Sequence, residues 1–333
     1  MKQYKTLRLA RMSVILALSL LAVITSLMMG NNAYANSDTV TVCITDEGSD
    51  RECDFTTLQA AVNHIHANSG INKIRILSSL PAESTETTIA NVYPGRNISF
   101  ICGSKSYVLS GDPTKDMIKG GSLLSQYRFE GCTFDTANRI LMLQGQKFTL
   151  VNNSFNNGAV SVGQSMATHT IDSNIFNNAV LAPRYGNFNI FNNVFMNRPV
   201  GISISSGGQF NVWHNTFDSL THGLHINHGA TSVKNTIVSN TYSFITQNTG
   251  TINSSNTLVH NVKFFRQGAP GGGTDTNIFK GDPLYVDSEL RIAKDSPAVG
   301  MGLVTSVTLD RDGNKRDGAP DLGAYEVQFL SGR

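Results

Sequence analysis

One ten-residue phrase recurs along this chain, and its repetition restricts the possible folds more than any other feature of the sequence. It reads FTLVNNSFNN from Phe148, HTIDSNIFNN from His169, FNIFNNVFMN from Phe188 and FNVWHNTFDS from Phe210. Aligned on an Asn-x-Phe core, the key positions follow one another about every 21 residues: Cys132, Asn153, Asn174, Asn193, Asn215, Asn235 and Asn256. A period of this length with small variations indicates one structural unit per repeat, with insertions placed in turns.

The residue types in the repeat favour one kind of solenoid. The chain lacks the L-x-x-L-x-L strands of leucine-rich repeats, the six-residue period of left-handed β-helices and the Gly-Asp nonapeptide of calcium-binding β-rolls. Charged residues make up only 15% of the chain, so polar groups must be satisfied largely without ions. We therefore expect an all-β fold, a right-handed parallel β-helix with three strands per coil and an N-terminal capping helix.

The repeat has a structural explanation in such a fold. Two places after each key position lies an apolar residue, and these residues are expected to form an inward column: Phe134, Phe155, Phe176, Phe195, Phe217, Ile237 and Leu258. The Asn column is expected to run amide hydrogen bonds from coil to coil at a turn. A second alternating stretch follows each phrase and directs Ser161, Ser203 and His225 outward.

The chain divides into four predicted segments. Residues 1–35 form a signal peptide with a basic start, an apolar run over 13–29 and the small-x-small pattern Ala33-Tyr34-Ala35; an uncleaved N-terminal anchor is the alternative. Residues 36–80 contain the N-terminal cap and first strand, 81–268 the coils, and 269–333 an irregular closing segment. We expect export to the periplasm, cell surface or exterior, and no integral membrane domain after cleavage.

The cap and the cysteines add local expectations. In FTTLQAAVNHI (55–65), Thr56 and Gln59 are spaced as a capping box, ahead of a helix with one apolar face. Cysteines in an exported chain can form disulfides, and we favour a Cys43–Cys53 bond at the N-terminal edge. Cys102 and Cys132 either pair or serve as small core residues on neighbouring coils.

At this point the chain resembles the pectin-lyase-like right-handed β-helix superfamily over its whole mature region. DPLYVD, LRIAKDSPAVGMG and DRDGNKR…PDLGAYE near its C-terminus are similar to the closing stretch of exported bacterial β-helix proteins called choice-of-anchor Q proteins. The resemblance implies the fold and export. Members of the superfamily include lyases, hydrolases, epimerases, tailspikes and adhesins, so the activity has to be argued from residues.

The coil body is poor in acids. Between Thr136 and Thr274 there are two, Asp172 and Asp218, against seven Lys and Arg and six His. This argues against a carboxylate-pair hydrolase, which needs two acids across a groove. A basic surface without acids would attract a polyanion, although solvated turn residues are an equally valid explanation. No motif supports nucleic-acid binding.

The segment THGLHINHG supplies the most suggestive cluster of candidate residues. In a lyase, His225 would be the base, and Arg198, Arg184 or Tyr185 would neutralise the substrate carboxylate or protonate the leaving oxygen. We assign the neighbouring outward positions to substrate binding: Ser203, Ser205, Asn227 and Gln247. Alternation along the strand predicts that His225 points away from His222 and His228, which argues against a metal site. The other interpretation is that these residues are exposed to solvent and have no specific function.

These observations predict a monomeric protein that binds an extracytoplasmic, anionic polysaccharide. A uronate polysaccharide lyase and a purely structural or adhesin-like surface protein are the alternatives. We expect no cofactor, with one calcium candidate at Asp310, Asp312 and Asn314, which alternate like the start of a calcium loop. A closing turn in which these carboxylates pair with Arg316 or backbone amides is the preferred interpretation.

Overall fold

Parallel strands that stack coil upon coil build the molecule. The structure is a computed structural model that describes residues 38–42, 53–68, 70–81, 87–89, 95–268 and 271–329. Contacts group Thr39–Arg333 into one compact unit. The predicted signal peptide lies outside the described residues, and so does Cys43 of the expected Cys43–Cys53 bond. All pairings between named strands of the described residues are parallel, and each strand pairs with the one a full coil later.

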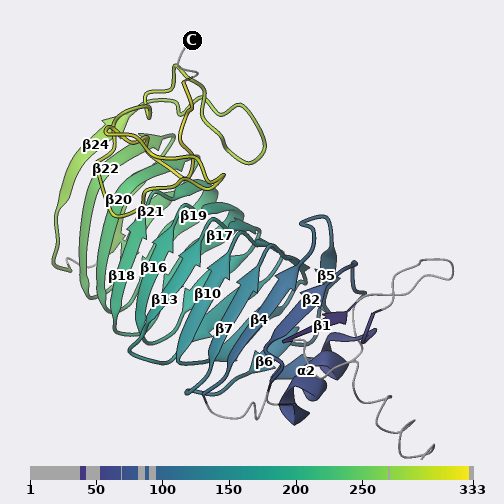
Figure 1. Cartoon of the computed structure of the whole chain (residues 1–333). Helices are drawn as coiled ribbons and strands as arrows, with labels where there is room; N and C mark the ends of the chain where they lie inside the picture. Colours follow the sequence, from purple (N-terminus) through teal and green to yellow (C-terminus); the bar gives the residue numbers. More distant parts are fainter. Residues whose placement is uncertain are drawn as a thin grey trace, which may run out of the picture. The chain divides into compact units, whose positions relative to one another are not determined.

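The strands form three columns, which we call faces A, B and C. Face A contains β1 (Thr39–Val42), β2 (Lys73–Ile76), β4 (Asn97–Cys102), β7 (Gln126–Glu130), β10 (Lys147–Val151), β13 (Thr168–Asp172), β16 (Asn187–Phe191), β18 (Gln209–Trp213) and the first halves of β20 (Ala230–Ser239) and β22 (Thr251–His260). Figure 1 shows this face as a row of strands from β4 to β18.

The other two faces follow in chain order within each coil. Face B contains β5 (Val108–Ser110), β8 (Thr133–Asp135), β11 (Ser154–Asn156), β14 (Ile175–Asn177), the first parts of β17 (Val194–Ile204) and β19 (Thr216–Ile226), the second halves of β20 and β22, and β24 (Asp275–Lys280). Face C contains β3 (Thr87–Ile89), β6 (Ile118–Gly120), β9 (Arg139–Gln144), β12 (Ala159–Gly163), β15 (Val180–Pro183), the last parts of β17 and β19, β21 (Ser243–Gln247) and β23 (Phe264–Gly268). The fold is thus the expected right-handed parallel β-helix.

Stacked aromatic rings fill the interior of the coils. Phe155, Phe176, Phe195 and Phe217 continue the column that starts at Phe134, with ring centroids 4.7–5.3 Å apart. Each ring is at most 1% exposed, so the column buries aromatic surface without interruption. The register corrects the last two members of the predicted column. Val238 is the partner of Phe217, whereas Ile237 pairs with Thr216 and faces outward.

Left-handed backbone conformations mark the corners between faces A and B. They occur at Asn152, Ser173, Asn192, His214, Asn235 and Asn256, with φ between 51° and 60°. Asn is the residue that tolerates this conformation best after Gly. The buried amide ladder lies one residue later, at Asn153, Asn174, Asn193 and Asn215. Each corner therefore has two adjacent positions that favour Asn, one for the left-handed backbone and one for the amide ladder. The sequence analysis treated these two positions as a single one.

A helix stands at the N-terminal end of the stack. It is α2 (Leu58–Ala67), and its N-cap is Thr57, whose hydroxyl accepts from the Ala60 amide; the predicted cap at Thr56 was one residue early. Leu58, Ala61, Val62 and Ile65 are buried, as the apolar periodicity predicted. A disulfide joins Cys102 to Cys132 on the next coil, which decides the question that the sequence left open.

The C-terminal segment folds back along the stack. After β24 the chain runs over the outer side of face B, where Ala324 and Tyr325 pack on Val194 and Met196, and Leu322 packs on Ile237. Figure 1 shows this segment in yellow beside the last coils. Face B is therefore covered over these coils, and faces A and C stay open to solvent there.

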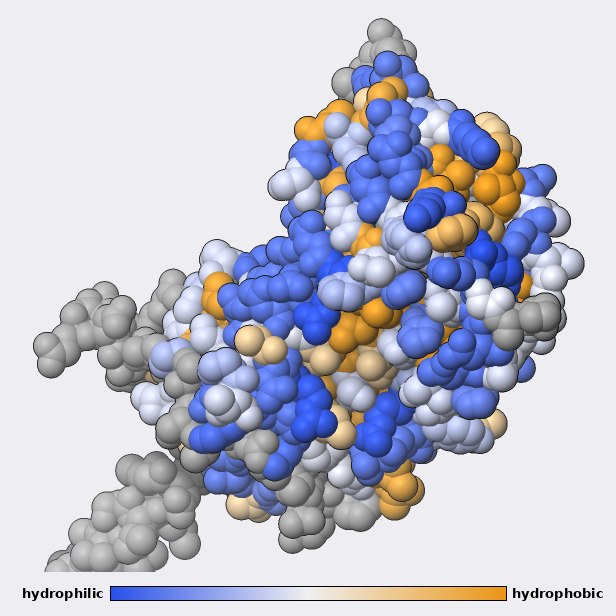
Figure 2. All heavy atoms as spheres, turned by 180° about the vertical axis from the view of Figure 1, so that it is seen from behind, coloured by the Kyte–Doolittle hydropathy of each residue, from blue (hydrophilic) through white to orange (hydrophobic). Residues whose placement is uncertain are grey.

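The side of the molecule that faces away from the viewer in Figure 1 is predominantly polar. Figure 2 shows mostly hydrophilic residues on the side opposite to Figure 1, with apolar residues gathered near the middle of this side and around the C-terminal end. In the described part of the chain, helices are too short and too polar to cross a bilayer.

Candidate functional site

The outward rows of face C contain most of the predicted site residues. Alternation along β17 and β19 buries Ile202, Ile204, Leu224 and Ile226 and turns the residues between them to solvent. Ser203 pairs with His225, and His225 pairs with Thr246 on the next coil. The structure therefore brings Ser203 and His225 together, as the sequence predicted.

A second outward row runs beside the first. It contains Ser205, Asn227 and Asn248, and the Asn248 Nδ2 donates to Asn227 Oδ1 at 2.6 Å. Because coils repeat about every 4.8 Å, the two rows offer a hydroxyl, imidazole or amide group at each step over these three coils. The rows that we describe contain no carboxylate.

Gln247 was wrongly assigned to this surface. It pairs with Ile226, is 1% exposed and points into the interior. Its amide donates to the Gly250 carbonyl, and its Oε1 accepts from Arg266 Nη1 at 2.6 Å. The offset between these coils is 21 residues, so Thr246 takes the outward place beside His225.

The two arginines do not converge on His225. Arg198 pairs with Leu220, which lies about 15 Å along the strand from His225, and its guanidinium donates to the Asn178 carbonyl of the preceding coil. Arg184 follows β15, two coils or about 10 Å before His225, with the exposed Tyr185 beside it. The predicted catalytic group of His225, Arg198, Arg184 and Tyr185 is therefore spread along the face.

His222 and His225 are neighbours, contrary to the prediction from strand parity. Their ring centroids are 6.2 Å apart, and His222 Nδ1 lies 2.8 Å from the Thr246 hydroxyl. β19 turns from face B to face C just before these residues, so simple alternation does not hold there. Burial and then the proximity of His225 lower the pKa of His222. His228 contacts Thr249 instead.

Two other histidines add no charge to the surface. His169 and His214 are fully buried. Burial lowers the pKa of His169 to about 4 and that of His214 to about 2, so both are neutral at physiological pH. These two histidines therefore add nothing to the basic character of the coils.

A basic and aromatic hollow at the last coils was missed by the sequence analysis. We call it the terminal hollow; it encloses about 480 Å³ and is lined by Val259, His260, Asn261, Val262, Lys263, Lys280 and Gly281. Tyr242 and Phe264 stand beside it and are 43% and 37% exposed. The signal in the sequence was the basic and aromatic pair Lys263-Phe264, one repeat after Tyr242.

The calcium candidates are engaged in other contacts. The carboxylate of Asp310 accepts from the backbone amides of Asp312, Asn314 and Glu326. Asp312 pairs with Arg291 at 2.8 Å. These bonds match the closing turn that we preferred. The described residues hold no group of three or more His, Cys, Asp or Glu suited to a metal ion.

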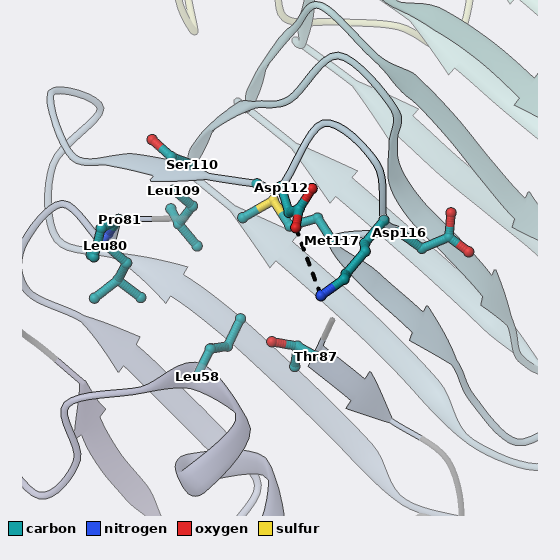
Figure 3. Close-up of a pocket in the computed structure, with 11 residues that line it drawn as sticks. Leu58, Leu80, Pro81, Thr87, Leu109, Ser110, Asp112, Asp116 and Met117 are labelled. Atoms are coloured by element: carbon teal, nitrogen blue, oxygen red, sulfur yellow. Dashed lines mark ion pairs between the residues drawn. The ribbon is translucent and has the colours of Figure 1, made fainter. Parts of the chain in front are cut away.

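A small hollow beside α2 contains two acids. It encloses about 20 Å³, room for a water molecule rather than a sugar. Figure 3 shows Asp112 paired with the nearby lysine, and this Lys115–Asp112 distance is 3.7 Å. Asp116 is buried and accepts from Arg139 Nε at 2.6 Å. Both carboxylates of the hollow are thus paired with basic side chains, and we interpret the hollow as structural.

Comparisons with known proteins find a distant structural likeness. The chain matches no family model and no curated protein. Among solved structures it is similar to the crystal structure of pectate lyase Pel9A, with a TM-score of 0.43 and 11% identity over 87% of this chain and 97% of the other. The assignment of this chain as a parallel β-helix rests on its own strand pairing.

Proposed function

We propose that the protein is exported by its residues 1–35 and binds an extracytoplasmic, anionic polysaccharide along face C. The observation that carries the proposal is the pair of outward rows through Ser203–His225–Thr246 and Ser205–Asn227–Asn248. A glycan laid across these three coils would meet one hydrogen-bonding group of each row per coil, at a spacing of about 4.8 Å that is comparable to a pyranose unit.

The placement of the acids supports an anionic ligand. Asp172 belongs to face A, and its carboxylate accepts from Asn192 and Ser173. Asp218 belongs to face B, and it accepts from Ser219, Ser239 and Asn240. The two acids of the coil body are therefore on other faces, while Arg184 adds positive charge beside face C.

A lyase is the second candidate, and the pair of imidazoles at His222 and His225 is the observation in its favour. Elimination needs a base and a cation at the same sugar unit. The separation of Arg184 and Arg198 from His225 favours binding without cleavage. We further propose, from the phrases of its closing segment, that the chain is related to choice-of-anchor Q proteins.

Retention of the protein on immobilised polyuronates and glycosaminoglycans tests the proposal. Ser203→Asp puts a carboxylate in the middle of face C and should weaken binding about five-fold through like-charge repulsion. Thr168→Asp adds the same charge to face A and should leave retention unchanged. Equal effects of the two variants would reject face C as the binding surface.

The same panel in solution separates the two functions. Ultraviolet absorbance of unsaturated ends, lost in His225→Ala, would establish a lyase and replace the binding proposal. No absorbance together with retention on one polymer is the expected outcome.

A further inference from the structure

The terminal hollow has the composition of a site for an anionic group. Lys263 and Lys280 line it from two consecutive turns of the chain, and His260 and Asn261 complete its polar wall. No carboxylate is among its lining residues. Asp282, the residue after Gly281, lies outside the lining, with its carboxylate 3.9 Å from His260. Neither lysine forms an ion pair with any residue in the described ranges, so both ammonium groups are available to a ligand.

Exposed aromatic rings border the same hollow. Tyr242 and Phe264 lie edge to face, with centroids 5.4 Å apart. The Lys263 ammonium lies over both rings, 4.8 Å from the centroid of Tyr242 and 5.5 Å from that of Phe264. Cation–π contacts at exposed sites are weak, so the ammonium can turn toward a stronger anionic partner and leave ring surface free.

The hollow adjoins face C. Phe264 pairs with Ser243, and Ser243 pairs with His222 on the preceding coil. His225 lies about 14 Å from Phe264, because the two residues are separated by three residues along the strand and by two coils along the stack. A glycan that crosses His225 can therefore reach the hollow within a few sugar units.

We propose that the terminal hollow binds the carboxylate or sulfate of an anionic sugar unit, with Lys263 and Lys280 holding the anion and Tyr242 and Phe264 contacting the sugar ring. The inference rests on the proposed function and extends it by naming the site that selects charge. A neutral glycan lacks the group that would pair the two ammonium ions. An anion without a ring would leave the aromatic pair unused.

Calorimetric titration of the whole protein tests the inference. The probes are a galacturonate hexamer, a heparin-derived hexasaccharide and neutral cellohexaose. Lys263→Ala with Lys280→Ala should raise the Kd for an anionic probe about ten-fold, since two charge contacts are lost. Lys294→Ala with Lys315→Ala removes the same charge from exposed positions of the closing segment and should change the Kd less than two-fold.

The aromatic part has its own variant. Tyr242→Ala should weaken binding of the anionic probe, and Tyr242→Phe should keep it, because the ring and not the hydroxyl makes the contact. Tighter binding of the galacturonate hexamer would identify carboxylate as the group that is bound. Tighter binding of the heparin-derived hexasaccharide, which carries both groups, would show that sulfate adds to the contact.

The outcomes separate the two proposals. If the protein binds an anionic probe and both double variants weaken it equally, the hollow is not the site, while binding along face C stands. If cellohexaose binds as tightly as the charged probes, charge selection is wrong. If the unmodified protein binds none of the probes and is not retained on any polymer, the proposed function fails and the inference with it.

Discussion

The side chain of Asn174 shows why the repeat keeps one residue type at a buried corner. Its Nδ2 donates to Asn193 Oδ1 at 3.0 Å and to the carbonyls of Leu150 and Asp172 at 2.9 Å. Its Oδ1 accepts from the amide and the Nδ2 of Asn153. Every polar atom of the side chain is thus used, and the bonds link three successive coils. Only Asn offers a donor and an acceptor with this reach.

Replacing this residue should break the ladder at both neighbours. In Asn174→Leu the buried donors of Asn153 lose their acceptor, and each unsatisfied group costs about 1–3 kcal/mol. We expect the free energy of unfolding to fall by at least about 3 kcal/mol, measured from urea denaturation midpoints followed by the fluorescence of Trp213. Asn248→Ala removes an exposed amide–amide bond and should cost less than about 1 kcal/mol. A small effect at Asn174 would show that the ladder is not a source of stability.

Residue types could be predicted better than their register. Asn153 and its equivalents were recognised because the ladder repeats. Asn235 was placed in the same ladder, but its φ of 53° identifies it as the left-handed corner residue. Its amide bonds to the backbone of Leu303 in the closing segment. The left-handed corner position and the ladder position both favour Asn, so the sequence alone cannot distinguish them. A shift of one residue in the alignment exchanges the side chains that point inward with those that point outward. The misplacement of Gln247 has the same origin.

At the scale of elements, the closing segment explains an anomaly in face B. The outward row changes from Thr133 and Ser154 to Ile175 and Val194 on the coils that the segment covers. Ile237 and Leu258, which the sequence assigned to the interior, belong to this covered row and contact Leu322, Ile292 and Ala298. The segment was recognisable from its phrases, but its position depends on contacts between distant residues that no local pattern encodes.

Arg316 anchors this segment to the coils. It is 5% exposed, and its guanidinium donates to Glu326, to Asn192 of the coil corner and to the carbonyl of Gly323. Removing one partner of a buried ion pair leaves the other charge without compensation.

We expect Arg316→Ala to loosen the closing segment while the coils persist. The loss should be about 3–5 kcal/mol, the usual cost of breaking a buried pair from one side. Limited proteolysis should cut the variant within the segment at low protease concentration, with the β-sheet circular dichroism retained. Lys315→Ala alters the exposed neighbouring residue and should leave the cleavage rate as it is. Simultaneous loss of the coil signal would mean that segment and coils unfold as one unit.

At the largest scale, the described coils form a linear stack in which each coil contacts mainly the coils before and after it. In such a stack stability is approximately a sum of local terms and neighbour terms, so a change at one end has little effect at the other. The covered face B stabilises the C-terminal half, and the Cys102–Cys132 bond links two coils of the N-terminal half. Faces A and C are left for ligands on the coils that the segment covers, which is why we place the function on an open face.

Hydrogen exchange on a variant without the Cys102–Cys132 bond tests this linear behaviour. The disulfide closes a loop with a sequence separation of 30, and its loss should destabilise the coils around it by about 3.5 kcal/mol. We expect faster exchange in β4, β7 and β8 of Cys102→Ala with Cys132→Ala, and unchanged exchange in β18 and β20. The strands of the last coil, β23 and β24, are more exposed than their neighbours and should exchange fast in both proteins. If hydrogen exchange is accelerated equally in every coil, the stack opens as a whole. A local opening around the missing disulfide would leave exchange in the distant coils unchanged.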